Sequence, residues 1–138
     1  MTNTVAAIFG VIYFLTGVTG FIMTPGGGVF LGIFAVSWFH HLFHILLGAL
    51  GPVSAWRNKG YLYCRASGAV LILLGILGFI TPGLVVRLLA IPPADLFTDN
   101  LLHLVTGSAL MYFGFVSRPV DNNLVAPAGR STRKRNFS

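Results

Sequence analysis

Three of the four histidines in this chain lie within five positions of one another, and the fourth stands near the start of a later apolar run. His40, His41 and His44 form the first group, and His103 follows Asp99 by four positions in the second. Residues three or four positions apart share one face of a helix. Such imidazole and carboxylate groups can hydrogen-bond between helices, bind a metal ion or a porphyrin, or relay protons.

Hydrogen bonding between helices is the interpretation that we favour for this polar patch, with Asn100 and Asp99 as partners of the imidazoles. One alternative is axial ligation of a haem or chlorophyll by His44 and His103. Another is a transition-metal site that adds His40 and Asp99 to these two histidines, and a third is a proton relay. We expect His44 and His103 to face the interior of the protein and His40 to face its surface.

The sequence contains an internal repeat. Residues 17–26 return as residues 75–83 with one residue deleted, and residues 41–48 return as residues 100–107. Both copies of the second motif keep a histidine and a terminal glycine at the same places. A repeat of this length indicates a duplicated helix pair, and it gives the two candidate haem ligands equivalent positions.

The composition is that of a membrane protein. Hydrophobic residues make up 55% of the chain and charged residues 9%, whereas charged residues are about 25% of a typical soluble domain. A helix needs about 20 apolar residues to cross a bilayer. Four runs meet this length, and they are Val5–Met23, Ser37–Trp56, Tyr61–Ile80 and Asp99–Val116.

These runs predict an all-α integral membrane four-helix bundle, built from two tandem helix hairpins at residues 5–56 and 61–116. Two hairpins with the same orientation would be related by a pseudo-twofold axis along the membrane normal. The connections Thr24–Val36 and Thr81–Thr98 are rich in Gly and Pro yet largely apolar, so we expect them at the membrane surface. The membrane domain would comprise residues 1–117, followed by a basic, disordered tail at 118–138.

Lysine and arginine are distributed unevenly over the expected ends of the bundle. If both termini lie on one side, that side carries every basic residue except Arg87. The positive-inside rule then places both termini in the cytoplasm, and the protein in the bacterial inner or intracytoplasmic membrane. The basic tail is interpreted first as a topology anchor, with anionic lipid or an acidic partner as alternatives. This charge lies in membrane flanks and gives no support to nucleic-acid binding.

Glycines are spaced along the four runs at helical intervals. Helices in lipid gain little from hydrophobicity against one another, so small residues that permit close backbone approach provide much of their packing. We therefore expect the glycines to line helix–helix contacts rather than a ligand site. The residues in question are Gly10, Gly17, Gly20, Gly48, Gly68, Gly75, Gly78 and Gly107.

Features typical of enzymes are missing from the sequence. There is no glutamate, no HExxH motif and no recognisable catalytic triad. Cys64 is the single cysteine and is expected to be a packing residue. The sequence therefore predicts a protein that is not an enzyme.

The two histidine motifs resemble those of a family of small bacterial four-helix membrane proteins known as a domain of unknown function. In that family both copies read Asn-x-x-His-x-x-x-Gly, and the resemblance extends from Thr4 to Ser117. This chain departs from the family at His41, which stands where the first Asn is usual, and it adds His40. The resemblance implies the fold but no activity.

We therefore expect a non-catalytic accessory or stabilising subunit of a larger membrane assembly, bound to another membrane protein or to a second copy of itself. The alternative function is a haem- or chlorophyll-binding membrane subunit, with His44 and His103 as the axial ligands.

Overall fold

The computed structural model describes residues 1–91 and 96–116, so the predicted tail at 118–138 lies outside the described residues. The described chain is mostly helical, as predicted, and the four expected spans match four long helices to within three residues at each end. The elements in order are α1 (Thr2–Met23), β1 (Gly28–Phe30), β2 (Phe34–Val36), α2 (Trp38–Trp56), α3 (Gly60–Ile80), α4 (Pro82–Leu88) and α5 (Phe97–Val116).

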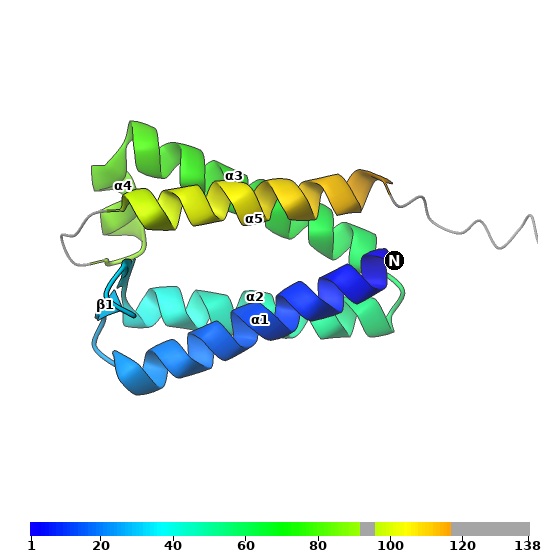
Figure 1. Cartoon of the computed structure of the whole chain (residues 1–138), viewed down its shortest axis with the longest axis horizontal. Coiled ribbons are helices and arrows are strands. Elements are labelled where there is room, and N and C mark those ends of the chain that lie inside the picture. Colours follow the sequence, from blue (N-terminus) through cyan, green and yellow to red (C-terminus); the bar gives the residue numbers. More distant parts are fainter. Residues whose placement is uncertain (92–95, 117–138) are drawn as a thin grey trace, which may run out of the picture.

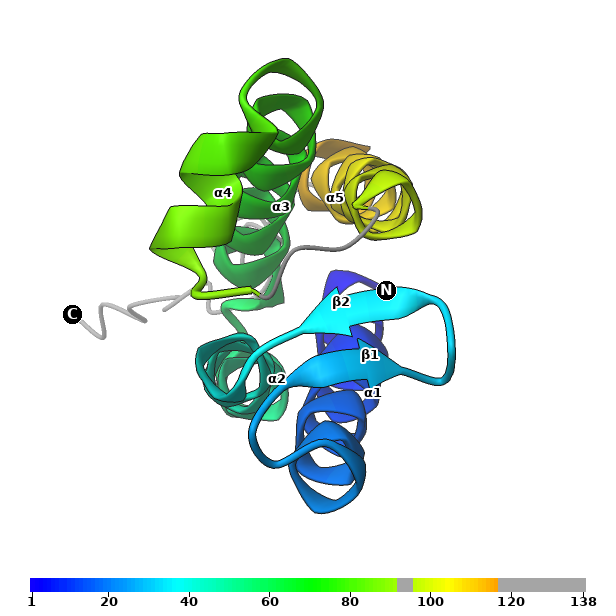
Figure 2. The same ribbon diagram turned by 90° about the vertical axis from the view of Figure 1, so that its left-hand side faces the viewer.

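The long helices are arranged as two pairs. Helix α1 packs along α2, and α3 packs along α5 (Figure 1). Seen from the end, the two pairs lie one above the other, with β1 and β2 in front of the lower pair and α4 beside the upper one (Figure 2). The N-terminus and the α2–α3 connection lie at the opposite end of the molecule (Figure 1).

Glycines lie where the helices of each pair are closest. A Cβ atom added to Gly10 would lie 2.6 Å from the carbonyl oxygen of Gly48, and one added to Gly68 would lie 2.8 Å from that of Gly107. Ordinary contacts of a Cβ atom begin at about 3.4 Å. Backbones can approach this closely only where side chains are absent, so these contacts depend on glycine within each pair.

Two further glycines in each pair contact the start of the second helix. Cβ atoms on Gly17 and Gly75 would meet the carbonyl oxygens of His41 and Asn100, at 2.7 and 2.9 Å. One turn further on, Gly20 lies against the His41 ring, and Gly78 lies against the Asn100 side chain. The two pairs thus share one pattern of close contacts.

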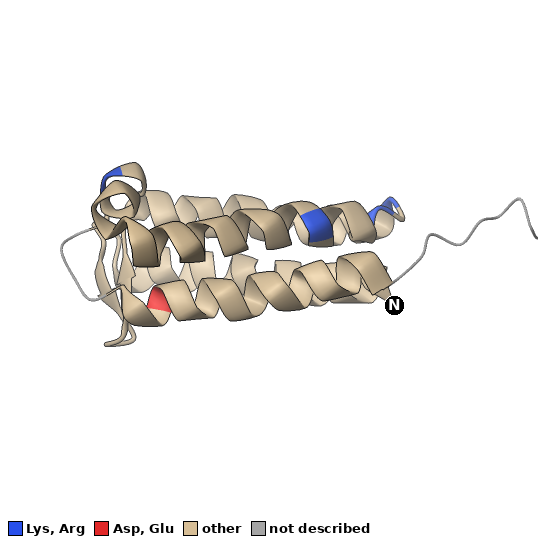
Figure 3. Cartoon of the chain, turned by 90° about the horizontal axis from the view of Figure 1, so that it is seen from above, with Lys and Arg blue, Asp and Glu red and all other residues tan. Residues whose placement is uncertain are grey.

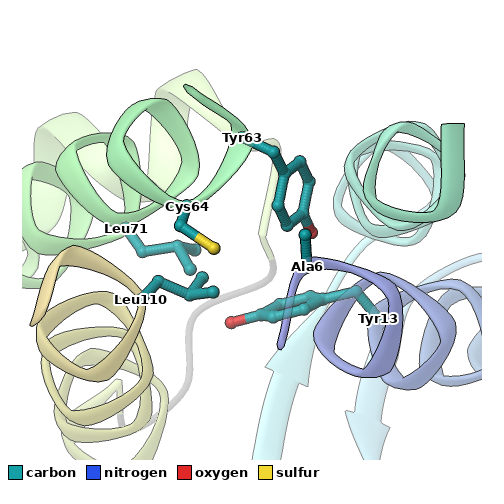
Figure 4. Packing of buried hydrophobic residues seen from close by; sticks show 6 residues of the cluster. All are labelled: Ala6, Tyr13, Tyr63, Cys64, Leu71 and Leu110. Carbon is teal, nitrogen blue, oxygen red and sulfur yellow. The ribbon is translucent and has the colours of Figure 1, made fainter. Parts of the chain in front are cut away.

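The two pairs meet through side chains that fill the space between α1, α3 and α5. Tyr13 reaches across and its hydroxyl lies 2.9 Å from Oγ1 of Thr106, within hydrogen-bond distance. Cys64 is fully buried, as expected of a packing residue. Figure 4 shows the cluster formed by Ala6, Tyr13, Tyr63, Cys64, Leu71 and Leu110.

The connections between the helices contain elements that the sequence did not predict. β1 and β2 form an antiparallel hairpin in which Val29 pairs with Ala35. The hydroxyl of Ser37 accepts a hydrogen bond from the His40 amide, which caps the start of α2, and donates one to the Leu89 carbonyl after α4. A second apolar cluster packs β2 against α4 and the residues around it. It contains Ala35, Val85, Leu89, Ile91 and Leu96.

Helices α1 and α3 are long and apolar enough to cross a membrane. Helices α2 and α5 have similar lengths but carry the histidines, Asp99 and Asn100. Among the described residues, the charged ones lie towards the two ends of the molecule (Figure 3).

Candidate functional site

Three histidines from both helix pairs converge near the end covered by the β-hairpin. His40 and His44 are one turn apart on α2, and His103 lies on α5. One ring nitrogen from each lies within 4.8 Å of the other two. The ring centroids of His40 and His44 are 4.5 Å apart, and those of His40 and His103 are 5.9 Å apart. We call these three residues the histidine cluster.

The histidine cluster is largely shielded from solvent. His40 is 2% exposed, His103 is 6% exposed, and His44 is partly buried. The expectation that His40 faces the surface is therefore wrong. Strand β2 packs against α5 close to the first turn of α2, so the N-terminal part of α2 is covered rather than open.

Several nitrogens of the cluster lack a hydrogen-bond partner among the described residues. They are Nε2 of His44 and both ring nitrogens of His40, whose ring lies close to the Ala35 backbone without a hydrogen bond of good geometry. A buried polar atom without a partner costs about 1–3 kcal/mol. Hydrogen bonding between helices, which we favoured from the sequence, therefore does not account for His40.

The cluster lines a cavity of about 210 Å³ between the two helix pairs. Tyr13 packs edge-on against His44, with ring centroids 5.1 Å apart. Phenylalanines of the hairpin contribute to one end of the lining. Besides the cluster, the lining includes Tyr13, Phe30, Phe34, His41, Asp99 and Thr106.

Asp99 connects α5 to the hairpin. Its side chain is buried, and Oδ2 accepts a 2.8 Å hydrogen bond from the backbone amide of Ala35 in β2. The carboxylate thus contributes to the same cavity as the histidines while it holds the hairpin over them.

His41 and Asn100 serve a different contact. Nε2 of His41 lies 3.0 Å from Oγ1 of Thr24 and 3.2 Å from the Thr24 carbonyl oxygen. Its ring lies against Gly20, and Asn100 lies against Gly78 in the same way. These two residues pack against the C-terminal part of the first helix of each pair, and they do not belong to the histidine cluster.

The polar patch predicted as one unit is therefore divided in two. This division could have been predicted from the internal repeat, because residues at aligned positions occupy equivalent positions in the two helix pairs. The first and third aligned pairs line the cavity, and both members of the second contact glycine, although His41 also contributes to the cavity lining. These pairs are His40 with Asp99, His41 with Asn100, and His44 with His103.

A porphyrin or chlorin does not fit this arrangement. The cavity is smaller than the roughly 300–1,000 Å³ of pockets that hold drug-sized ligands. A macrocycle between His44 and His103 would also have to displace the ring of His40, which packs against His44. The site is suited to a much smaller group, such as a metal ion.

The fold and site define a small helical protein with a buried histidine cluster between two helix pairs. The chain belongs to the family described as "Domain of unknown function (DUF4383)", whose model matches residues 3–116. This match confirms the resemblance to a family of unknown function, and it includes all four long helices. No curated protein and no solved structure shows a significant match to the chain.

Proposed function

We propose that the protein is an integral membrane four-helix bundle in which α1, α2, α3 and α5 each cross the bilayer. The two helix pairs are tandem hairpin repeats related by a pseudo-twofold axis along the membrane normal. The matched glycine contacts at Gly10–Gly48 and Gly68–Gly107 support this relation. The cytoplasmic or intracytoplasmic membrane of a bacterium is the proposed location.

The observation that carries this proposal is the distribution of apolar and charged side chains. Helices of 19 to 22 residues extend about 28–33 Å at 1.5 Å per residue, close to the roughly 30 Å hydrocarbon thickness of a bilayer. Large apolar side chains are exposed along all four, including Leu15, Leu46, Leu73 and Val105. Charges lie towards the helix ends (Figure 3). Lipid would cover this surface at no desolvation cost.

Basic residues support an orientation with both termini in the cytoplasm. Arg57 and Lys59 lie in the α2–α3 connection next to the N-terminus, and Arg65 lies in the second turn of α3, whereas Arg87 lies in α4 at the hairpin end. The Arg65 guanidinium donates from Nε to the Gly114 carbonyl at 2.7 Å. It also lies over the Phe115 ring, 4.3 Å from its centroid, an arrangement that suits a basic side chain near the membrane interface.

We further propose a non-catalytic role as an accessory or stabilising subunit in a membrane assembly. Outside the four long helices, the described residues form a short hairpin, a seven-residue helix packed onto the bundle and short connecting turns. They offer little surface to a soluble partner, so the apolar sides of the helices are the main surface for binding. The partner is thus a membrane protein, with a second copy of this chain as the alternative outcome.

Photo-crosslinking in intact membranes tests this role. A photoreactive amino acid at Leu73, which is 56% exposed, should give a discrete adduct that mass spectrometry identifies as another membrane protein. Leu71 lies on the same helix but is fully buried, so the same substitution there is the matched control and should give none. If exposed positions on every long helix crosslink only to lipid, the accessory role is wrong.

The haem or chlorophyll alternative receives no support from the cavity, as its size and the position of His40 show. Its test is the absorption spectrum of the purified protein. We expect no Soret or chlorin band, and a stoichiometric band lost in both His44→Ala and His103→Ala would establish the alternative instead.

A further inference from the structure

We propose that His40, His44 and His103 bind a single transition-metal ion of the zinc and copper class. This site is independent of the accessory role, because it depends on the interior of the protein and not on its lipid-facing surface.

Helix geometry supplies two of the three ligands. His40 and His44 are four positions apart on α2, the spacing by which two histidines on one helix face bind a metal ion together. His103 of α5 approaches from the other helix pair. Each of the three histidines contributes one ring nitrogen, and these three nitrogens lie within 4.8 Å of one another.

These distances are close to those of an occupied site. Bonds of about 2.0–2.1 Å from zinc to nitrogen, at tetrahedral angles, would place the nitrogens about 3.3 Å apart. Rotations of the imidazole rings about their side-chain bonds can produce this contraction. The cavity next to the cluster leaves room for the ion and a fourth ligand.

A second observation is independent of the spacing. His40 is 2% exposed, and although its ring lies close to the Ala35 backbone, neither ring nitrogen makes a hydrogen bond of good geometry among the described residues. Nε2 of His44 is also buried and unpaired. Coordination of a metal ion by these lone pairs would compensate for the desolvation of the rings.

The ligand atoms determine the class of metal. Imidazole nitrogen suits zinc, copper, nickel and iron, whereas calcium and magnesium prefer oxygen. Asp99 lines the same cavity, but its Oδ2 accepts the hydrogen bond from the Ala35 amide, so the three histidines alone define the proposed site. An ion here would join α2 to α5 and therefore one helix pair to the other.

Metal titration of the purified full-length protein tests this proposal. The protein is prepared in detergent without a histidine tag and freed of metal with a chelator. Binding of Zn²⁺ is then measured by calorimetry, and binding of Co²⁺ by the visible absorption bands that nitrogen ligands give this ion. We expect saturable binding of one ion per chain and a higher melting temperature in its presence.

Two substitutions and one matched control locate the site. His103→Asn should weaken Zn²⁺ binding at least 100-fold, since loss of even an outer-shell partner costs about 10–100-fold. His40→Asp introduces the residue that stands at the equivalent position of the second repeat, Asp99. It should change the Co²⁺ absorption spectrum, because an oxygen ligand replaces a nitrogen ligand. His41→Asn also introduces the second repeat's residue, but outside the cluster, and should leave affinity and stoichiometry unchanged.

The wild-type titration decides the outcome even if a variant fails to fold. Absence of saturable Zn²⁺ and Co²⁺ binding by folded wild-type protein would overturn the proposal. So would Zn²⁺ affinity that His103→Asn leaves unchanged, a Co²⁺ spectrum that His40→Asp leaves unchanged, or binding that His41→Asn abolishes.

Discussion

Substitution of Gly10 or Gly68 by alanine tests whether the backbones of each helix pair are in direct contact. A Cβ atom at Gly10 would lie 2.6 Å from the Gly48 carbonyl oxygen and 2.7 Å from Cα of Gly51. At Gly68 the corresponding backbone distances are 2.8 Å, to the Gly107 oxygen and the Met111 amide nitrogen. Backbone atoms cannot rotate away, so the helices must separate by about 0.6–0.8 Å to restore ordinary contact.

Two opposing effects determine the size of the loss in stability. Overpacking costs about 1–3 kcal/mol, whereas alanine favours the helix over glycine by about 1 kcal/mol. We therefore expect each variant to lose about 0–2 kcal/mol, with Gly10→Ala losing more because its contacts are shorter. The assay is reversible unfolding in mixed micelles of mild detergent and SDS, followed by circular dichroism.

Gly83→Ala is the matched control for this series. Gly83 lies near the start of α4, and a Cβ atom there would meet nothing within 4 Å beyond its chain neighbours and the backbone of its own helix. We expect this variant to be as stable as the parent or slightly more stable. If Gly10→Ala and Gly68→Ala are as stable as Gly83→Ala, the claim that the helix backbones are in direct contact at Gly10 and Gly68 is wrong.

Two further predictions concern the same contacts. Gly17→Leu and Gly75→Leu should each lower stability by about 1–3 kcal/mol, because a larger side chain must enter a backbone contact below 3 Å; unchanged melting temperatures in both would contradict this. His41→Ala and Thr24→Val should each cost about 1 kcal/mol by breaking their shared hydrogen bond. Their double variant should lose less than the sum of the two in SDS unfolding, and strict additivity would show that the bond contributes nothing.

Helix positions were predictable from the sequence because apolar length alone determines them. The runs beginning at Val5 and Tyr61 needed no knowledge of tertiary contacts, and α1 and α3 agree with them to within three residues. The hairpin was missed for a physical reason. Its strands are only three residues long, which is too short for alternation to be recognised, and the turn depends on Leu31 and Gly32 with positive φ.

The content of the histidine cluster was only partly predictable. Equivalent positions for His44 and His103 followed from the repeat, and both line one cavity. The sequence could not show which of His40 and His41 lies on the same side of the helix as His44. At about 100° per residue, His41 is displaced from His44 by about 60° around the helix and His40 by about 40°, and the two angles are similar. Burial of His40 depends on β2 and α5, which are distant in sequence.

The orientation of the protein in the membrane is the central claim, and cysteine labelling of intact cells tests it most directly. Single cysteines are placed at Lys59 and Gly83, both exposed, in a Cys64→Ala background. Lys59 is chosen over its neighbour Asn58 because the positive φ of Asn58 would strain a cysteine there. We predict that a membrane-impermeant maleimide labels the Gly83 site in intact cells and the Lys59 site only after permeabilisation. Labelling of the Lys59 site in intact cells would contradict the four-span bundle with cytoplasmic termini.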